Sequence, residues 1–196
     1  MLIYLFIIIL LKTYFKSYYK KYDYHSLFRS FFCFGISTLS LLTTILYWNN
    51  LILNPFDSNW LSIHINKLML TYMLYDTAYY IYSNKYRIDL LIHHIICIGF
   101  FGINYNKLLL TFCSINEIIS AFNWIGILYP NYSWIGKLIR LYSILFVRLF
   151  VWIYTLYFIH NDIFIFYIGL LFVSIFIGLD LYWISIILNN YFNPNK

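Results

Sequence analysis

The chain has 196 residues, of which 63% are hydrophobic and 10% are charged, and its mean hydropathy is +0.74. Soluble domains carry about 25% charged residues, so this composition excludes an ordinary soluble domain and predicts an integral membrane protein. The formal net charge is +6. In a membrane protein, the distribution of Lys and Arg among the loops carries more information than the total. We expect no nucleic-acid partner.

Seven apolar segments follow one another along the chain. They cover residues 2–15, 27–48, 61–82, 88–103, 108–129, 138–159 and 163–188. A spanning helix needs roughly 20 apolar residues, and the three prolines fall between or after the segments, where a helix breaker costs least. The pattern predicts an all-α, multi-pass transmembrane bundle of about seven helices, with six as the alternative because the first segment is short.

Three parts are expected in the chain. Residues 1–23 form an N-terminal membrane anchor and a basic cytosolic loop, residues 24–190 form the transmembrane domain, and residues 191–196 form a short polar tail. The first segment lacks a basic start and a small-residue cleavage site, so we interpret it as a retained anchor rather than a signal peptide.

The basic residues alternate from loop to loop. The loop after the first segment is rich in lysine, residues 49–60 contain no Lys or Arg, and Lys85 and Arg87 precede the fourth segment. The positive-inside rule then predicts a lumenal or external N-terminus and a cytosolic C-terminus. This orientation places Asn131, in the one N-glycosylation sequon Asn-Tyr-Ser, in the cytosol.

Ionisable side chains occur inside the predicted spans. Asp76, the adjacent His93 and His94, and Glu117 are costly at membrane depth, so each needs a partner, a water-filled cavity or a function. Counting along the helices places most of these groups at one level, in the cytosolic half of the bundle. Such a level predicts a polar cavity for a lipid or another substrate. The residues expected to line it are Asp76, Tyr80, Asp89, Glu117, Ser120, Asn123, Trp124, Arg148 and Asp180.

The histidine pair offers a candidate general base. Asp89 is four residues before His93, so the two share a helix face, and the carboxylate could orient the His93 ring. His94 points about 100° away and faces a neighbouring helix. A purely structural alternative has both histidines bonded to hydroxyls across the bundle, and Arg148 paired with Asp180.

Metal and redox chemistry are not indicated. The other histidines, His25, His64 and His160, lie near segment ends on different sides of the membrane, so we expect no metal centre and no cofactor. The three cysteines sit in apolar segments without a CxxC spacing, and we expect buried thiols rather than disulfides. They are Cys33, Cys97 and Cys113.

The order of these motifs resembles the TLC-domain family, which covers translocation-associated, longevity-assurance and ceroid-lipofuscinosis membrane proteins. The resemblance spans about residues 24–189. It rests on an Asp-x-x-x-Tyr helix from Asp76, an Asp-x-x-x-His-His helix from Asp89, and the following stretch NEIISAFNW from Asn116. It implies a bundle of six or more helices around a polar-floored cavity, usually in the endoplasmic reticulum or another endomembrane.

Some family members are ceramide synthases, which acylate a sphingoid amine from acyl-CoA, and others influence membrane lipid composition. His93, His94 and Glu117 match parts of the synthase motif. The chain has Leu109, Leu110 and Cys113 where the synthases carry further acid–base residues. It is therefore closer to the family members without that chemistry.

Three hypotheses follow. The first is a non-catalytic or weakly catalytic TLC-domain protein whose partner is a membrane lipid. The second is a sphingoid-base N-acyltransferase, with His93 or His94 as general base and acyl-CoA as co-substrate. The third is a transporter or channel whose pathway the ionisable residues line.

Overall fold

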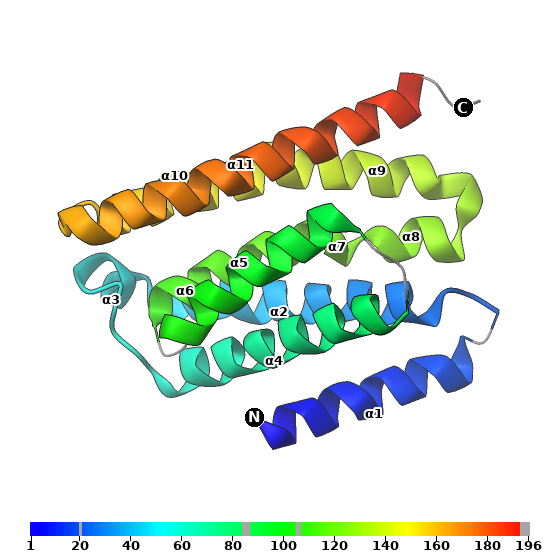
Figure 1. Ribbon diagram of the computed structural model, residues 1–196, viewed down its shortest axis with the longest axis horizontal. Coiled ribbons are helices and arrows are strands. Elements are labelled where there is room, and N and C mark those ends of the chain that lie inside the picture. Colours follow the sequence, from blue (N-terminus) through cyan, green and yellow to red (C-terminus); the bar gives the residue numbers. More distant parts are fainter. Residues whose placement is uncertain (20, 84–86, 105–106, 193–196) are drawn as a thin grey trace.

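The structure is a computed structural model that describes residues 1–19, 21–83, 87–104 and 107–192 (Figure 1). Within these ranges the chain is helical apart from short connections, and it contains no strand. The α-helices are α1 (Leu2–Tyr18), α2 (Tyr24–Leu46), α3 (Trp48–Leu53), α4 (Trp60–Tyr82), α5 (Ile88–Asn104), α6 (Leu108–Cys113), α7 (Ile118–Ala121), α8 (Asn123–Leu128), α9 (Ser133–Tyr142), α10 (Leu149–Ile159) and α11 (Ile163–Phe192). Three segments between them are not α-helical. The segments η1 (Ser114–Glu117) and η2 (Pro130–Tyr132) are 3₁₀ turns, and η3 (Ser143–Arg148) is a π-helical segment.

Helical backbone covers all seven predicted segments, and the all-α prediction is confirmed for the described residues. Four stretches are long and apolar enough to cross a membrane, and they are Tyr24–Leu46, Leu108–Leu128, Pro130–Ile159 and Ile163–Asn189. The first, third and fourth predicted segments, which became α1, α4 and α5, are not among these four. The class of membrane protein is therefore supported, and the count of seven spans stays a prediction. The short helix α3 was not predicted from the sequence.

Polar caps explain where two of the long helices begin. The side chain of Asp23 accepts a hydrogen bond from the backbone of Ser26 at 3.2 Å at the start of α2. Asn59 and Ser62 form a reciprocal capping box at the start of α4, with the Ser62 backbone donating to Asn59 at 2.8 Å. These caps satisfy backbone N–H groups that the first helical turn leaves without partners.

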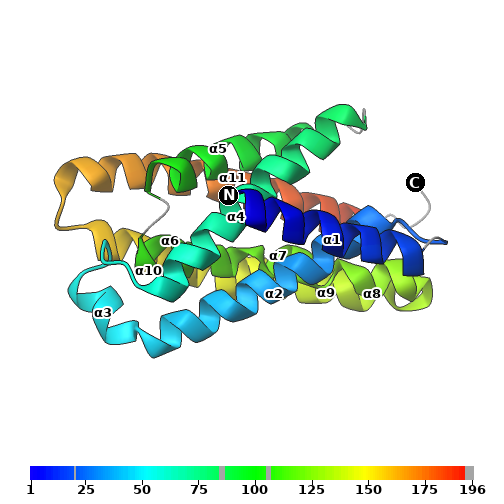
Figure 2. The same ribbon diagram turned by 90° about the horizontal axis from the view of Figure 1, so that it is seen from below.

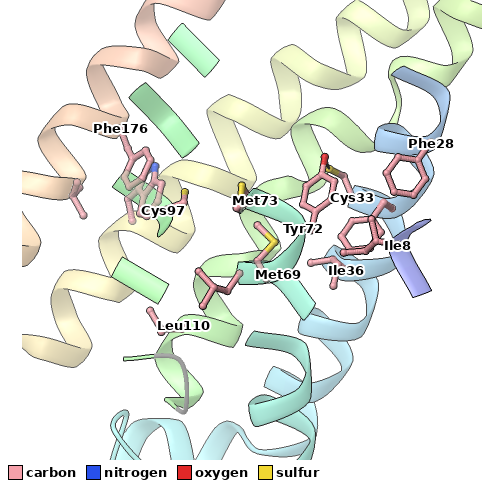
Figure 3. Close-up of a cluster of buried hydrophobic side chains, with 14 residues drawn as sticks. Ile8, Phe28, Cys33, Ile36, Met69, Tyr72, Met73, Cys97, Leu110 and Phe176 are labelled. Atoms are coloured by element: carbon pink, nitrogen blue, oxygen red, sulfur yellow. Dashed lines mark hydrogen bonds between the residues drawn. The ribbon is translucent and has the colours of Figure 1, made fainter. Parts of the chain in front are cut away.

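One face of helix α2 packs against α1, α4 and the interrupted helix that runs from α6 to α8 (Figure 2), while its other face is exposed. Helix α4 packs between α2 and α5, and α11 packs against α10. Figure 3 shows Tyr72 and Met69 of α4 between Cys33 and Ile36 of α2 on one side and Cys97 of α5 on the other. This cluster holds together the helices that carry the ionisable groups.

The outward faces are strongly apolar. Large hydrophobic side chains on α1, α9, α10 and α11 are exposed, including Leu2 at 85% and Leu181 at 62%. Soluble monomers rarely expose contiguous apolar patches of more than a few hundred Å². The exposed surface therefore agrees with a membrane location.

A polar link joins the α3–α4 connection to the start of α6. The Asn66 side chain donates to the carbonyl of Lys107 at 2.7 Å and accepts from the Thr111 hydroxyl at 3.1 Å. The backbone N–H of Leu108 donates to the carbonyl of Asp57 at 2.8 Å. Since both ends of the Asn66 amide are satisfied, this link fastens the helices at the end of the bundle opposite the C-terminus (Figure 1).

Candidate functional site

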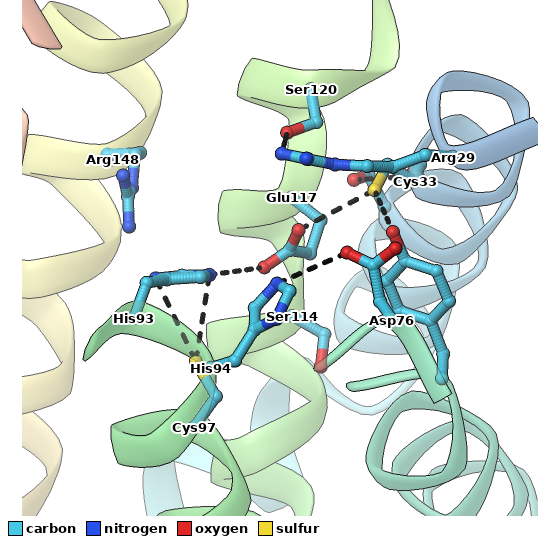
Figure 4. Close-up of polar contacts among 12 residues, drawn as sticks. Arg29, Cys33, Asp76, His93, His94, Cys97, Ser114, Glu117, Ser120 and Arg148 are labelled. Atoms are coloured by element: carbon cyan, nitrogen blue, oxygen red, sulfur yellow. Dashed lines mark hydrogen bonds and ion pairs between the residues drawn. The ribbon is translucent and has the colours of Figure 1, made fainter. Parts of the chain in front are cut away.

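The carboxylate of Asp76 is fully buried between two histidines. Nε2 of His25 on α2 lies 2.9 Å from Oδ1, and Nε2 of His94 on α5 lies 3.4 Å from Oδ2 (Figure 4 shows the His94 contact). Nδ1 of His94 lies 3.1 Å from the hydroxyl of Thr77. Asp76 thus ties three helices together, although Oδ2 has an ion-pair contact rather than a well-aligned hydrogen bond.

His93, the other histidine of the pair, points toward Glu117 rather than toward Asp76. Nε2 of His93 lies 3.3 Å from Oε1 of Glu117, while the Cys33 thiol donates to Oε2 of Glu117 at 3.6 Å (Figure 4). The sulfur of Cys97 lies 3.8 Å from Nε2 of His93. His93 and Glu117 are 6% and 8% exposed, so both act in a medium that screens charge far less than water does.

A cavity of about 30 Å³ lies beside the His93–Glu117 pair. Its wall is mainly apolar, with Phe100 on α5 and Phe172 and Phe176 on α11. A cavity needs at least about 10–15 Å³ to hold a water molecule. This one therefore accommodates a small polar group but not an acyl chain.

Asn116 also lines this cavity, and it is 4% exposed. Neither its amide nitrogen nor its carbonyl oxygen has a hydrogen-bond partner among the described residues. A buried polar group without a partner costs about 1–3 kcal/mol. The Asn116 amide is therefore available to form hydrogen bonds with a group that enters the cavity.

Irregular backbone positions two of the site residues. The 3₁₀ turn η1 ends at Glu117, and the wider π-helical segment η3 ends at Arg148. Such interruptions inside long helices often occur at functional sites. Both side chains line the cavity, so the two interruptions of the regular helix meet there.

Arg29 joins the site from α2. It donates to the Tyr80 hydroxyl at 2.6 Å and to the Ser120 hydroxyl at 3.4 Å. The sequence interpretation missed both Arg29 and His25 as site residues, although His25 does lie near a helix end, as the second residue of α2. The two residues are four apart on one face of α2, and that spacing was the available signal.

Arg148 and Asp180 form a buried ion pair between η3 and α11, with exposures of 1% and 6%. Oδ2 of Asp180 also accepts from the indole nitrogen of Trp152 at 3.3 Å. The structural alternative for these two residues, mutual pairing, is what the structure contains. Arg148 still lines the cavity, and its Nε has no hydrogen-bond partner among the described residues.

Asp89 does not orient His93, and that prediction was wrong. Its carboxylate instead accepts from Arg87 at 2.5 and 3.3 Å and from the indole nitrogen of Trp183 at 2.7 Å. Residues four apart share a helix face, but Asp89 is in the first turn of α5 and its side chain turns toward α11. Glu117 takes the partner role that the sequence assigned to Asp89.

The remaining predicted cavity residues divide into two groups. Tyr80 and Ser120 belong to the site through their bonds to Arg29. Asn123 and Trp124 do not line the cavity, and the Trp124 ring stacks on Phe31 with centroids 5.9 Å apart. The partial turn at Phe122 separates α7 from α8 and takes these two side chains away from the cavity.

Cysteine and metal chemistry can be assessed on the described residues. Cys33, Cys97 and Cys113 are buried free thiols, as expected. Within the described ranges, no group of three or more His, Cys, Asp or Glu side chains is placed to hold a metal ion.

Comparisons with known proteins show no relative. No family model matches the chain, no curated protein is significantly similar to it, and no solved structure is a significant match.

Proposed function

We propose that this chain is a TLC-domain-like membrane protein that binds a lipid at the His93–Glu117 site and thereby influences membrane lipid composition. The observation that carries the proposal is the unpartnered amide of Asn116 beside this pair, in a cavity with apolar walls. A ligand that combines a small hydrogen-bonding group with a long apolar part fits both features.

The polar end of such a lipid would be a hydroxyl or an amine. Asn116 supplies one acceptor and two donors, and Glu117 supplies an acceptor for an N–H or O–H group. The apolar chain would lie outside the cavity, along the exposed apolar faces of α5 and α11. The cavity of about 30 Å³ has room for the polar end alone.

A binding role is favoured over catalysis by what surrounds the pair. Leu109 and Leu110 are buried in hydrophobic clusters, and the Cys113 thiol lies 3.4 Å from the Thr155 hydroxyl. His94 is held by Asp76 and does not line the cavity. Among the described residues that line it, the cavity therefore has one His–Glu pair and no second histidine or carboxylate.

Lipid that co-purifies with the protein tests the proposal. Native mass spectrometry of the wild-type protein in detergent is expected to show a bound lipid, and Asn116→Leu and Glu117→Gln are expected to lose it. His160→Gln is the matched control, because His160 is exposed and outside the cavity. Equal lipid occupancy in all four proteins, or none in the wild type, would refute the proposal.

An N-acyltransferase is the second candidate function, and the 3.3 Å contact between His93 and Glu117 favours it. A histidine held by a carboxylate is a suitable general base for deprotonating an amine. Purified protein given a sphingoid base and acyl-CoA would then form product, and His93→Ala would abolish it while His160→Ala would not. No product across acyl-chain lengths counts against this function, and substrate flux in proteoliposomes would favour transport.

The orientation belongs to the same proposal. Arg87 directly precedes α5, and Lys137 lies in the first half of α9. Both helices begin toward the end of the bundle where α11 ends (Figure 1), which supports a cytosolic C-terminus and a lumenal N-terminus in an endomembrane. The sequon at Asn131 then faces the cytosol. Expression in a eukaryotic membrane system is expected to leave Asn131 unglycosylated, and a glycan there would reverse the orientation.

A further inference from the structure

A second polar cavity opens at the end of the bundle near the C-terminus. It is an open cleft of about 510 Å³ between the start of α5, α9 and α11, and its polar lining includes Arg87, Asp89, Arg140 and Tyr182, with the indole of Trp183. This volume is within the range of small-molecule sites. It is about seventeen times the volume of the cavity beside His93, so it has room for a whole charged group.

The charges in this cleft do not balance. Asp89 is the one carboxylate among the described residues that line it, and that carboxylate is already paired with Arg87 and bonded to Trp183. Arg140 has no carboxylate within ion-pair distance among the described residues, and its buried Nε has no hydrogen-bond partner there. Its guanidinium lies over the Trp183 ring at 5.7 Å, which holds the group in place without neutralising it.

Arg29 places a further positive charge near Arg140, although Arg29 itself is attracted by the Asp76 carboxylate. A separate narrow space of about 10 Å³ shares Arg140 and Trp183 with the cleft, and its lining also includes Arg29, His93 and Glu117. Arg29 donates to the neutral hydroxyls of Tyr80 and Ser120, and its charge repels Arg140, as does that of Arg87. Asp76 attracts Arg29, and Arg87 is paired with Asp89. The Arg140 guanidinium lacks a carboxylate within ion-pair distance among the described residues, and an anion in the cleft would supply its counter-charge.

We propose that this cleft binds a phosphate group, with Arg140 as its principal ligand and Arg87 and the Tyr182 hydroxyl as further donors. A planar guanidinium donates two parallel hydrogen bonds to a phosphate. Trp and Tyr are enriched at the level of lipid headgroups, so a phospholipid headgroup is one source of the phosphate. A soluble phosphate compound is the other source. This site lies outside the His93–Glu117 cavity and does not rest on the function proposed for it.

Equilibrium binding to the full-length protein in detergent tests the inference. Four probes are used separately. Dihexanoyl phosphatidic acid represents a lipid headgroup, inorganic phosphate and AMP represent soluble phosphate compounds, and dihexanoylglycerol is the lipid without a phosphate. We expect Arg140→Gln to weaken binding of the phosphate probes at least tenfold. Lys137→Gln is the matched control, because Lys137 is exposed on the same helix, carries the same charge and is absent from the cleft lining, and it is expected to change binding less than twofold.

The probes distinguish the two sources. Tighter binding of phosphatidic acid than of AMP and inorganic phosphate identifies a lipid headgroup, and the reverse identifies a soluble phosphate compound. Equal binding of dihexanoylglycerol and phosphatidic acid, or unchanged phosphate binding in Arg140→Gln, overturns the inference. If Arg140→Gln fails to fold, Arg140→Lys keeps the charge but loses the two-pronged donor, and it is expected to weaken phosphate binding at least threefold.

The result is separable from the proposed function. Arg140→Gln is expected to leave the lipid at the His93–Glu117 cavity in place, and Asn116→Leu is expected to leave phosphate binding unchanged. A phosphate affinity that fell equally in both variants would contradict a separate phosphate site.

Discussion

Two buried asparagines occupy opposite situations in this bundle. Asn66 is fully buried, and its amide both donates to the Lys107 carbonyl and accepts from the Thr111 hydroxyl. Asn116 is 4% exposed and has no hydrogen-bond partner among the described residues. The first residue completes a link between helices, whereas the second faces a cavity. The comparison separates Asn66, whose side chain stabilises the fold, from Asn116, whose side chain contributes no hydrogen bond to the fold and is available to a ligand.

The same distinction sorts the ionisable groups. Arg148 and Asp180 satisfy each other, as Asn66 and its partners do, and their removal is expected to affect mainly stability. His93 and Glu117 pair at the edge of the cavity, where the pair is also accessible to a ligand. Folding and binding are therefore expected to respond to different substitutions.

The largest expected effect is on the Arg148–Asp180 pair. Asp180→Ala leaves a buried guanidinium without its counter-ion, which typically costs about 3–5 kcal/mol. We expect a large fall in the melting temperature in detergent, measured by size-exclusion chromatography after heating. The double variant Arg148→Met with Asp180→Leu removes both charges and is expected to recover most of the loss. A melting temperature that stayed low in the double variant would show that the two side chains contribute more to the structure than neutralising each other.

A smaller loss is expected at Asn66. Asn66→Leu leaves the Lys107 carbonyl and the Thr111 hydroxyl without partners, and an orphaned buried polar group costs about 1–3 kcal/mol. The same heating assay is expected to show lower stability, with lipid occupancy per folded molecule unchanged. A stable Asn66→Leu protein that had lost its lipid would reverse the roles assigned to the two asparagines.

The smallest effect on stability is expected at Asn116, and it has the opposite sign. Asn116→Leu replaces an unsatisfied amide by an apolar side chain of similar size, so lipid-free protein is expected to be unchanged or more stable by about 1 kcal/mol. Melting of delipidated protein measures this change. Destabilisation of the delipidated variant by more than this amount would show that Asn116 has a structural role after all.

The helical architecture could be predicted because it depends on local properties. Apolar runs of sufficient length, prolines between them and polar caps such as Asp23 and Asn59 locate the helices within a few residues. The positions of Asp76, His93 and His94 along their helices also predicted a common level for them, with Glu117 nearer to the middle of the membrane. Axial position follows from the rise per residue, which the sequence supplies directly.

The partners of these residues could not be predicted in the same way. His93 was assigned to Asp89 because the two are four apart, yet it pairs with Glu117, whose direction depends on the 3₁₀ turn η1. His25 and Arg29 were overlooked because nothing local indicates that α2 packs against α4 and α7. Pairings between helices depend on how each helix is rotated about its axis.

The sequence by itself determined that this protein belongs in a membrane, that it is helical, and which ionisable groups lie inside its apolar segments, since composition and periodicity act within each segment. Only the tertiary structure decided which of those groups satisfy one another and which are left open. Asn116 and Arg140 became candidates for ligand binding because the Asn116 amide and the Nε of Arg140 find no hydrogen-bond partner among the described residues. That outcome depends on helix rotation and on the interruptions at η1 and η3, which no pattern within one segment specifies.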